Sequence, residues 1–251
     1  MTAQFEEKPL FGGAITGTIP QGWLDASDIR QVPNHQEIFL SPTTLSNLII
    51  EINEYVPKQQ ALRTLSSAPE SLSQAGAAAH VGAEAEGVAA ALYHLRDLCD
   101  EGDTMDIINP PHPVQLKHFT AVNNLSAFTG IVKYTTPKKQ RSATAGINAL
   151  GREDSAQQQT SFTSIDGDVS GGRDTASSST TGPWRSSYSS HFLLVRLPEK
   201  ETDILVFVNV PHDEFDLQGD PRALAREEAI ASGLLEKFVE VLEVKNWDLF
   251  G

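Results

Sequence analysis

Short apolar runs, separated by glycine, proline and asparagine, predict that most of the ordered chain is β-structure. Segments with alternating or β-branched-rich patterns are typical of strands. We expect strands over residues 10–19, 36–40, 47–56, 104–108, 115–123, 127–136, 191–197 and 203–210. The last two segments have the strongest strand pattern, and they need the earlier strands as partners because an isolated hairpin is only marginally stable.

Helical spacing is found in two segments. Residues 87–99 place Leu92 and Leu95 on one apolar stripe, which predicts an amphipathic helix. A second helix begins at Asp220, with Pro221 in its first turn, as helix starts prefer. The apolar positions of this second helix would cover the sheet.

Local patterns near the two ends of the chain predict a short capped turn and a packed tail. Asp25 occupies a helix N-cap position with Asp28 three residues later, and Pro33 ends this helical turn. In the tail, Trp247 and Phe250 are expected to pack against the core and so attach the end of the chain to it.

Two segments of low complexity predict flexible insertions within one domain. Residues 63–86 are rich in alanine, serine and glycine, and residues 138–190 contain few large aliphatic side chains. Between residues 155 and 190, 16 of 36 residues are serine or threonine. Such a segment buries too little apolar surface to offset backbone ordering at roughly 1–2 kcal/mol per residue. We therefore expect a single domain over residues 1–251 that carries both insertions.

The acidic composition narrows the class of partner. A net charge of −14 disfavours nucleic acid and anionic membrane surfaces, and it favours a basic protein surface. The single cysteine, Cys99, permits no intrachain disulfide, which fits a reducing compartment. The first residues do not have the pattern of a secretory signal, and no apolar run reaches the roughly 20 residues of a membrane span.

Motifs of catalysis and of cofactor binding are missing from the sequence. Gly12-Gly13 lacks the Gly-Lys-Ser/Thr that completes a phosphate-binding loop, no His or Cys pair has zinc spacing, and no Gly-x-Ser-x-Gly occurs. His94, beside the apolar stripe of a helix, is expected to be a hydrogen-bonded structural histidine. We expect no cofactor, no metal and no catalytic residue.

Acidic residues outnumber basic ones near the beginning of the chain. Between residues 1 and 54 only Lys8 and Arg30 are basic, and the local charge is −5. The acidic residues there are Glu6, Glu7, Asp25, Asp28, Glu37, Glu51 and Glu54. If strand 47–56 pairs near strand 36–40, Asp25, Glu37, Glu51 and Glu54 would converge on a region suited to capture lysine and arginine side chains of a partner.

A solvated acidic rim is the competing interpretation of the same residues. Asp25 and Asp28 are explained as helix-start residues, and Glu37 as part of a solvated strand face. Glu51 and Glu54 have an odd spacing, so they point to opposite faces of a strand unless a bulge intervenes. A metal site is less supported than either reading, because these carboxylates have no calcium-loop spacing.

Several blocks of the sequence resemble one family from end to end. They include LFGGAI, PQGWLDASDIR, VPNHQEIF, YHLRDL, LVRLP, TDILVFVNVP and the terminal LEVKNWDLFG, together with residues 46–54. In this order they are similar to the Mog-type Ran-binding proteins, also called Ran guanine-nucleotide release factors. The resemblance covers nearly all predicted elements and omits the two insertions.

This resemblance implies an α/β fold of the α+β type, an antiparallel sheet sandwiched between helices and similar to PsbP. It also implies binding of the small GTPase Ran (GTP-bound, GDP-bound or nucleotide-free), promotion of nucleotide release and support of nuclear protein import. We expect a non-catalytic monomer in nucleus and cytoplasm. The implied partner-binding residues are Asp25, Asp28, Arg30, Asn34, Glu37, Glu51 and Glu54. Glu51 and Glu54 are the strongest candidates, whereas Asn34 replaces the family's usual aspartate.

Three alternatives stay open. The protein could be a Ran-binding adaptor without exchange activity, or a PsbP-like metal-associated or structural subunit, since one fold supports several functions. An enzyme whose site is assembled from scattered residues is a further rival.

Overall fold

Strands dominate the part of the chain that the computed structural model describes, which is residues 4–66, 83–119, 124–137, 185–217, 220 and 222–250. These residues belong to one compact unit, which comprises Met1–Pro137 and Arg185–Gly251. The strands are β1 (Phe5–Leu10), β2 (Ile15–Pro20), β3 (Leu24–Asp25), β4 (Gln36–Leu40), β5 (Asn47–Glu54), β6 (Thr104–Val114), β7 (Ser126–Pro137), β8 (Arg185–Leu197), β9 (Thr202–Pro211) and β10 (Glu243–Val244). The α-helices are α1 (Lys58–Ser66), α3 (Ala83–Asp97), α4 (Asp213–Leu217) and α5 (Ala223–Val241). Short 3₁₀ turns are η1 (Phe11–Gly13), η2 (Ala26–Asp28), η3 (Lys117–Phe119), η4 (Pro198–Lys200) and η5 (Trp247–Phe250).

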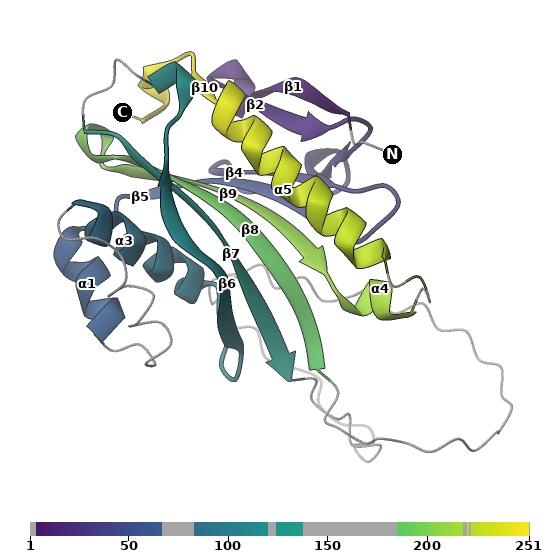
Figure 1. Ribbon diagram of the computed structural model, residues 1–251. Helices are drawn as coiled ribbons and strands as arrows, with labels where there is room; N and C mark the ends of the chain where they lie inside the picture. The colour runs from purple at the N-terminus through teal and green to yellow at the C-terminus, as the bar shows by residue number, and fades with distance from the viewer. Residues whose placement is uncertain are drawn as a thin grey trace, which may run out of the picture. The chain divides into compact units, whose positions relative to one another are not determined.

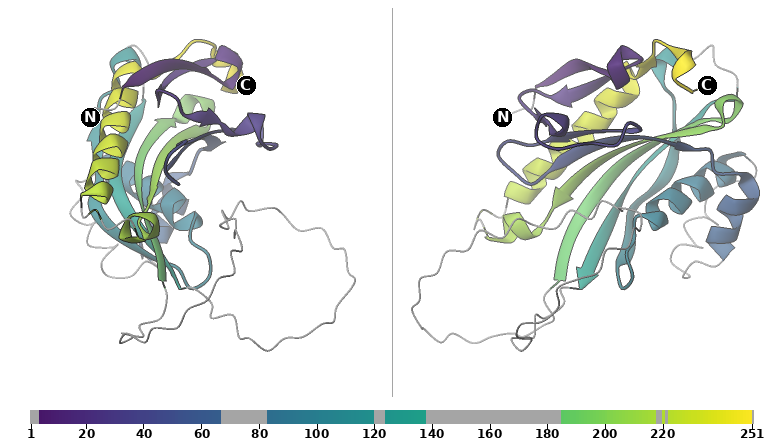
Figure 2. Two further views of the ribbon diagram at one scale, coloured as in Figure 1. Left: turned by 90° about the vertical axis from the view of Figure 1, so that its right-hand side faces the viewer. Right: turned by 180° about the vertical axis from the view of Figure 1, so that it is seen from behind.

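Seven strands form one antiparallel sheet in the order β3-β4-β5-β9-β8-β7-β6 (Figure 1). Helix α5 crosses one face of this sheet, together with the small sheet β1-β2-β10, and α1 and α3 lie against the other face (Figures 1 and 2). The predicted α+β class, with an antiparallel sheet between helices, is therefore confirmed.

Two apolar cores lie on the two faces of the sheet. The core under α5, here the α5 core, contains Val206 and Val208 of β9 and Phe238 of the helix. The core under α3, here the α3 core, contains Leu205 and Phe207 of the same strand. Because successive strand residues point to opposite faces, the continuous apolar run of β9 supplies both cores.

The predicted strand over residues 10–19 is confirmed from residue 15 onward as β2, but it is wrong before that, because residues 11–14 form the turn of a hairpin. Strands β1 and β2 pair antiparallel, with Leu10 opposite Ile15, and η1 connects them. Gly12 and Gly13 have φ angles of 65° and 90°, which glycine adopts without steric cost. The sequence pattern of small and β-branched residues runs through the turn without a break, and for this reason it did not reveal the reversal of the chain.

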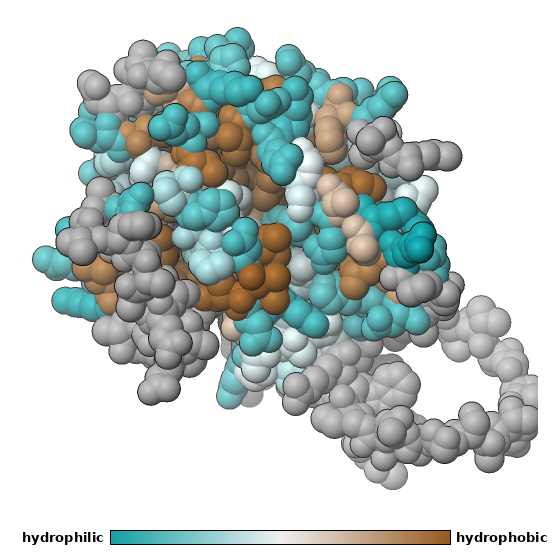
Figure 3. Space-filling view, viewed as in Figure 1, coloured by the Kyte–Doolittle hydropathy of each residue, from teal (hydrophilic) through white to brown (hydrophobic). Residues whose placement is uncertain are grey.

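The predicted end of a strand at Asn109-Pro110-Pro111 is also wrong. Strand β6 continues to Val114 with two register shifts, and it is the edge strand of the sheet. Proline lacks an N–H donor but is tolerated on an edge strand, where it also limits pairing with another chain. Hydrophobic side chains reach the surface over β6 (Figure 3), and Ile108 is 58% exposed.

Other predicted elements differ at their boundaries. Part of the predicted strand 115–123 is the 3₁₀ turn η3, and residues 120–123 lie outside the described residues. The predicted insertions begin and end in ordered structure, because α1 reaches Ser66, α3 begins at Ala83 and β8 begins at Arg185. Residues 67–82 and 138–184 lie outside the described residues, so the flexibility of the insertions and the single domain stay predictions.

The predicted packing of the tail is confirmed. The ring of Trp247 meets that of Phe119 edge-on, with centroids 6.1 Å apart, and Phe250 packs beside it at 5.9 Å. Both tail residues contact the α5 core. The end of the chain is also attached through its backbone, because the N–H groups of Lys245 and Asn246 donate to the Ala14 carbonyl.

A polar cluster joins α5 to the sheet. Glu228 of α5 accepts hydrogen bonds from His191 Nε2 and Ser189 Oγ of β8, and His212 Nε2 lies 3.3 Å from Glu228 Oε1. Burial raises the pKa of Glu228, but these three partners outweigh it and lower the pKa to about 2. The carboxylate therefore stabilises the contact between helix and sheet in its charged form.

Replacing either of two helical glycines by alanine should change the stability of the protein, in opposite directions. A Cβ on Gly87 would lie 1.9 Å from the Phe128 ring, whereas one on Gly233 would meet Phe5 at an ordinary 3.6 Å. We expect Gly87→Ala to lower the free energy of unfolding by about 1–3 kcal/mol through overpacking. Gly233→Ala should raise it by about 0.5–1 kcal/mol through helix propensity. Urea denaturation of both variants checks this, and a stabilised Gly87→Ala would contradict the packing of α3.

The Glu228 contact predicts acid sensitivity of folding. Its folded pKa of about 2 lies below the ordinary 4.5, so its stabilisation is complete above pH 4.5 and is lost as pH falls from 4.5 towards 2. We expect Glu228→Gln to flatten the fall of stability over this range. Thermal melts of parent and variant from pH 5 to pH 2 measure this, and parallel curves would refute the contribution.

Candidate partner-binding surface

The first acidic residues of the predicted site lie on β3 and η2, at one edge of the seven-stranded sheet. Asp25 is the N-cap of η2 and accepts hydrogen bonds from Ser27 N at 2.9 Å and Ser27 Oγ at 2.6 Å. The predicted cap is therefore confirmed. Asp28 is exposed in the first turn, next to Ile29, which is 66% exposed. This edge combines carboxylates with an accessible apolar side chain.

Glu37 is bound to its own chain. Its carboxylate accepts a hydrogen bond from the Phe11 N–H of η1, 26 residues earlier. Burial raises the pKa of Glu37, the Phe11 N–H opposes this, nearby Asp25 raises the pKa further and Lys8 lowers it. The half-buried carboxylate thus attaches the glycine turn to β4, which is a structural role that the sequence did not reveal.

Glu51 lies on the other face of the sheet. Across the β4–β5 pair, Gln36 stands opposite Glu51 and Glu37 stands opposite Ile50. Glu51 Oε1 accepts a hydrogen bond of 2.7 Å from Gln36 Nε2, and its Oε2 accepts one of 3.4 Å from Asn53. The carboxylate stays half exposed and oriented by two uncharged side chains.

Glu54 ends β5 and is exposed. It stands opposite Thr202 in a β5–β9 pairing that runs without a register shift. With no bulge in β5, Glu51 and Glu54 point to opposite faces, and Glu37 shares the face of Glu54. The four carboxylates therefore do not all lie on one face of the sheet, and their use as one binding region stays a prediction. The structure brings Asp25 and Glu37 together and separates them from Glu51.

The two remaining predicted residues lie in the connection from η2 to β4. Arg30 and Asn34 are both exposed, and the Arg30 N–H donates to the Ala26 carbonyl at 2.9 Å. The next residue after Asn34, His35, accepts a backbone hydrogen bond from Ile52 N. This connection therefore runs beside the second half of β5, where Glu51 and Glu54 are located.

A buried ion network behind the end of β5 was missed by sequence reasoning. Arg196 of β8 and Asp203 of β9 stand opposite each other and are 2% and 0% exposed. Asp203 Oδ1 accepts from Arg196 Nε at 3.1 Å, and Oδ2 lies 2.9 Å from His94 Nε2. The predicted structural role of His94 is thereby confirmed. The opposite charges on neighbouring strands were visible in the sequence, but their burial was not.

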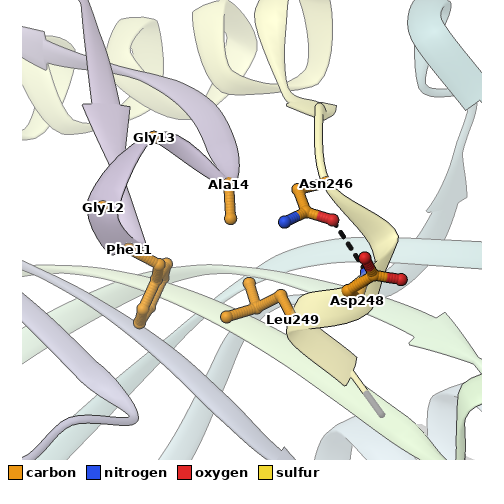
Figure 4. A pocket seen from close by; sticks show the side chains of 7 residues that line it. All are labelled: Phe11, Gly12, Gly13, Ala14, Asn246, Asp248 and Leu249. Carbon is orange, nitrogen blue, oxygen red and sulfur yellow. Dashed lines mark hydrogen bonds between the residues drawn. The ribbon is translucent and has the colours of Figure 1, made fainter.

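A shallow hollow lies between the turn after β1 and the segment after β10 (Figure 4). Asn246 Oδ1 accepts a 3.0 Å hydrogen bond from Asp248 N at its rim. Its lining is formed by Phe11, Gly12, Gly13, Ala14, Asn246, Asp248 and Leu249. Within the described ranges, no group of three or more His, Cys, Asp or Glu side chains is arranged to hold a metal ion. None of the helices described here combines the length and apolar character of a membrane span.

The fold defines an α+β protein with helices on both faces of an antiparallel sheet. Residues 8–211 match the family described as Ran-interacting Mog1 protein. Because this match covers most of the sequence, the chain belongs to that family.

Named relatives match over shorter segments. The Ran guanine nucleotide release factor of Bos taurus is 45% identical over 60 residues, which are 23% of this chain and 32% of that protein. The one of Homo sapiens is 50% identical over 46 residues, 18% of this chain and 25% of that protein. Nuclear import protein MOG1 of Saccharomyces cerevisiae is 34% identical over 64 residues, 21% of this chain and 29% of that protein. The matched segments thus span about a third or less of these curated relatives.

A solved structure supports the fold. The Saccharomyces cerevisiae Ran-binding protein Mog1p superposes with a TM-score of 0.53 at 20% sequence identity, covering 100% of both chains. The likeness to PsbP stays a prediction.

The structural role of Glu37 can be tested by two substitutions. Glu37→Ala leaves the Phe11 N–H without its acceptor, and we expect the free energy of unfolding to fall by about 1–3 kcal/mol. Glu37→Gln keeps an acceptor oxygen and should lose much less. Because the raised pKa of Glu37 marks a charge that folding disfavours, the stability of Glu37→Gln relative to the parent should rise as pH increases from 4 to 7. Equal losses in both variants would show that the hydrogen bond is unimportant.

Proposed function

We propose that this protein binds the small GTPase Ran through the acidic end of β5 and promotes release of its guanine nucleotide, in support of nuclear protein import. Membership of the Ran-interacting Mog1 protein family supports the partner. The names of its relatives, Ran guanine nucleotide release factor and nuclear import protein, support the activity and a place of action in nucleus and cytoplasm. In this proposal the protein is a regulator without covalent chemistry of its own.

The observation that carries the choice of surface is the position of Glu51 and Glu54 at the end of a strand in the middle of the sheet. Glu54 is exposed and Glu51 is half exposed, so both carboxylates are accessible from a rigid backbone. Arg30 and Asn34 in the neighbouring connection, and Asp25 and Asp28 on the adjoining edge, would extend the contact. Glu37 would support it indirectly, because its carboxylate holds η1 in place.

Nucleotide release follows from differential binding. A ligand shifts an equilibrium only by the difference between its affinities for two states. If the protein binds nucleotide-poor Ran more tightly than loaded Ran, the nucleotide must bind more weakly to the complex, because coupling between two ligands is reciprocal. The acidic residues would steer lysine and arginine side chains of Ran into register and raise the association rate.

Charge reversal should show whether Ran binding depends on this surface in particular or only on the overall negative charge of the protein. We expect Glu51→Lys and Glu54→Lys each to weaken binding to Ran by about tenfold or more, since opposed like charges cost more than the 1.4 kcal/mol of a tenfold change. The matched control is Glu236→Lys, an exposed position on α5 with the same change of net charge. Release of a fluorescent guanine nucleotide from loaded Ran, with each protein titrated in, measures the effect.

The outcomes of this titration are distinct. Saturable acceleration by the parent and by Glu236→Lys, but not by the β5 variants, would support partner, activity and surface together. Equal activity of a Glu51→Lys, Glu54→Lys double variant would show that the surface lies elsewhere. Binding without acceleration would make the protein a Ran-binding adaptor, and absence of binding would overturn the proposal.

A further inference from the structure

The backbone that follows Glu54 is held by charged side chains that are themselves buried. The Val56 N–H donates to Asp203 Oδ2 at 3.0 Å, and the Val56 carbonyl accepts from Arg196 Nη2 at 2.5 Å. The backbone N–H and the backbone carbonyl of Val56 are thus both bound by an ion pair between β8 and β9. Arg196, Asp203 and His94 are together called the clamp below.

The clamp is an expensive way to join two strands, because it buries charged groups. Removing two charges from water is costly, and buried ion pairs are often replaced by apolar residues without loss of stability. Here Asp203 is fully buried and uses both oxygens, one toward Arg196 and the other toward His94 and the Val56 N–H. Asp203 and Arg196 each also make one hydrogen bond to the backbone of Val56, just beyond β5. The ion pair is therefore directed at the segment that follows Glu54.

Tyr55, the residue between Glu54 and Val56, is also held by several contacts. The Arg196 guanidinium lies over the Tyr55 ring, 4.0 Å from its centroid. The Tyr55 hydroxyl donates to Glu86 Oε1 at 3.1 Å, and its backbone N–H donates to the Glu201 carbonyl at 2.9 Å. Residues 55 and 56 therefore have little freedom at the point where the chain leaves the sheet for α1.

We propose that the clamp is a positioning device for the carboxylate of Glu54, with Arg196 and Asp203 as positioning residues for the contact with Ran. This inference rests on the proposed function. Glu54 is exposed and carries the final pair of β5, so its direction depends on the residues that immediately follow. A clamped strand end fixes the backbone from which the Glu54 side chain extends, which reduces the ordering that binding would otherwise require.

A double-mutant cycle separates positioning from general stability. Arg196→Lys keeps the charge but loses the planar fork that reaches Asp203, Val56 and the Tyr55 ring together. We expect Arg196→Lys to weaken Ran binding by about tenfold in the parent, and by less than about twofold when Glu54→Gln is already present. Loss through general destabilisation would be the same in both backgrounds.

The matched control is Arg226→Lys, the same substitution at an exposed ion pair with Asp220, and it should leave affinity unchanged. Affinities are measured by titration at a temperature where thermal melts show every variant folded. Amide exchange at Val56 should be faster in Arg196→Lys and unchanged in Arg226→Lys. If Arg196→Lys does not fold, Tyr55→Leu, which leaves the ion pair intact, is taken through the same cycle.

Each result decides the matter. A loss confined to the background with Glu54 supports the clamp as a positioning device. Equal losses in both backgrounds, or unchanged affinity, overturn it while leaving Ran binding in place. If the parent itself does not bind Ran, the proposed function fails, and the inference falls with it.

Discussion

The structure depends on the burial of its central strands on both faces. Alternate residues of β9 enter two different cores, with Val206 and Val208 under α5 and Leu205 and Phe207 under α3. Strand β8 does the same with Leu193 and Leu194. A one-residue slip of either strand would exchange the two sets of side chains, so the register is strongly specified and every neighbouring element is placed by it.

Buried ionisable groups in such a fold must find partners, and they do so at two places in this sheet. Arg196 and Asp203 pair across β8 and β9 near the end of β5, and His191 meets Glu228 under α5. Each site links elements that are distant in sequence, because an unpaired buried charge would cost more than the fold can spare. The polar networks therefore hold the helices and the strand ends in fixed places.

The acidic residues of the first third have more than one role. Asp25 caps a turn, Glu37 accepts a backbone N–H, and Glu51 and Glu54 stay accessible on β5. A local excess of negative charge is thus partly structural and partly available to a basic partner. Separating the two roles requires hydrogen-bond partners and burial, which charge counting does not provide.

Much of the fold was predictable, because local patterns specified the elements. The strands over 36–40 and 47–54 and the last two strands follow from β-branched runs, and the C-terminal helix from its apolar spacing. The hairpin at Gly12-Gly13 and the continuation of β6 through its prolines were not predicted. Their outcome depends on which strand pairs with which, and on the position of β6 at the sheet edge.

For the site, the sequence supplied the candidate residues and not their arrangement. It determined the acidic excess and the Asp25 cap, because these depend on composition and on neighbours along the chain. The ordered sequence blocks identified the family, and the α+β class followed from that resemblance. Only the tertiary structure decided that Glu37 is bound to η1, that no bulge in β5 alters the opposite faces of Glu51 and Glu54, and that an ion pair holds Val56. Those results depend on strand register and burial, which arise from contacts between residues far apart in the chain.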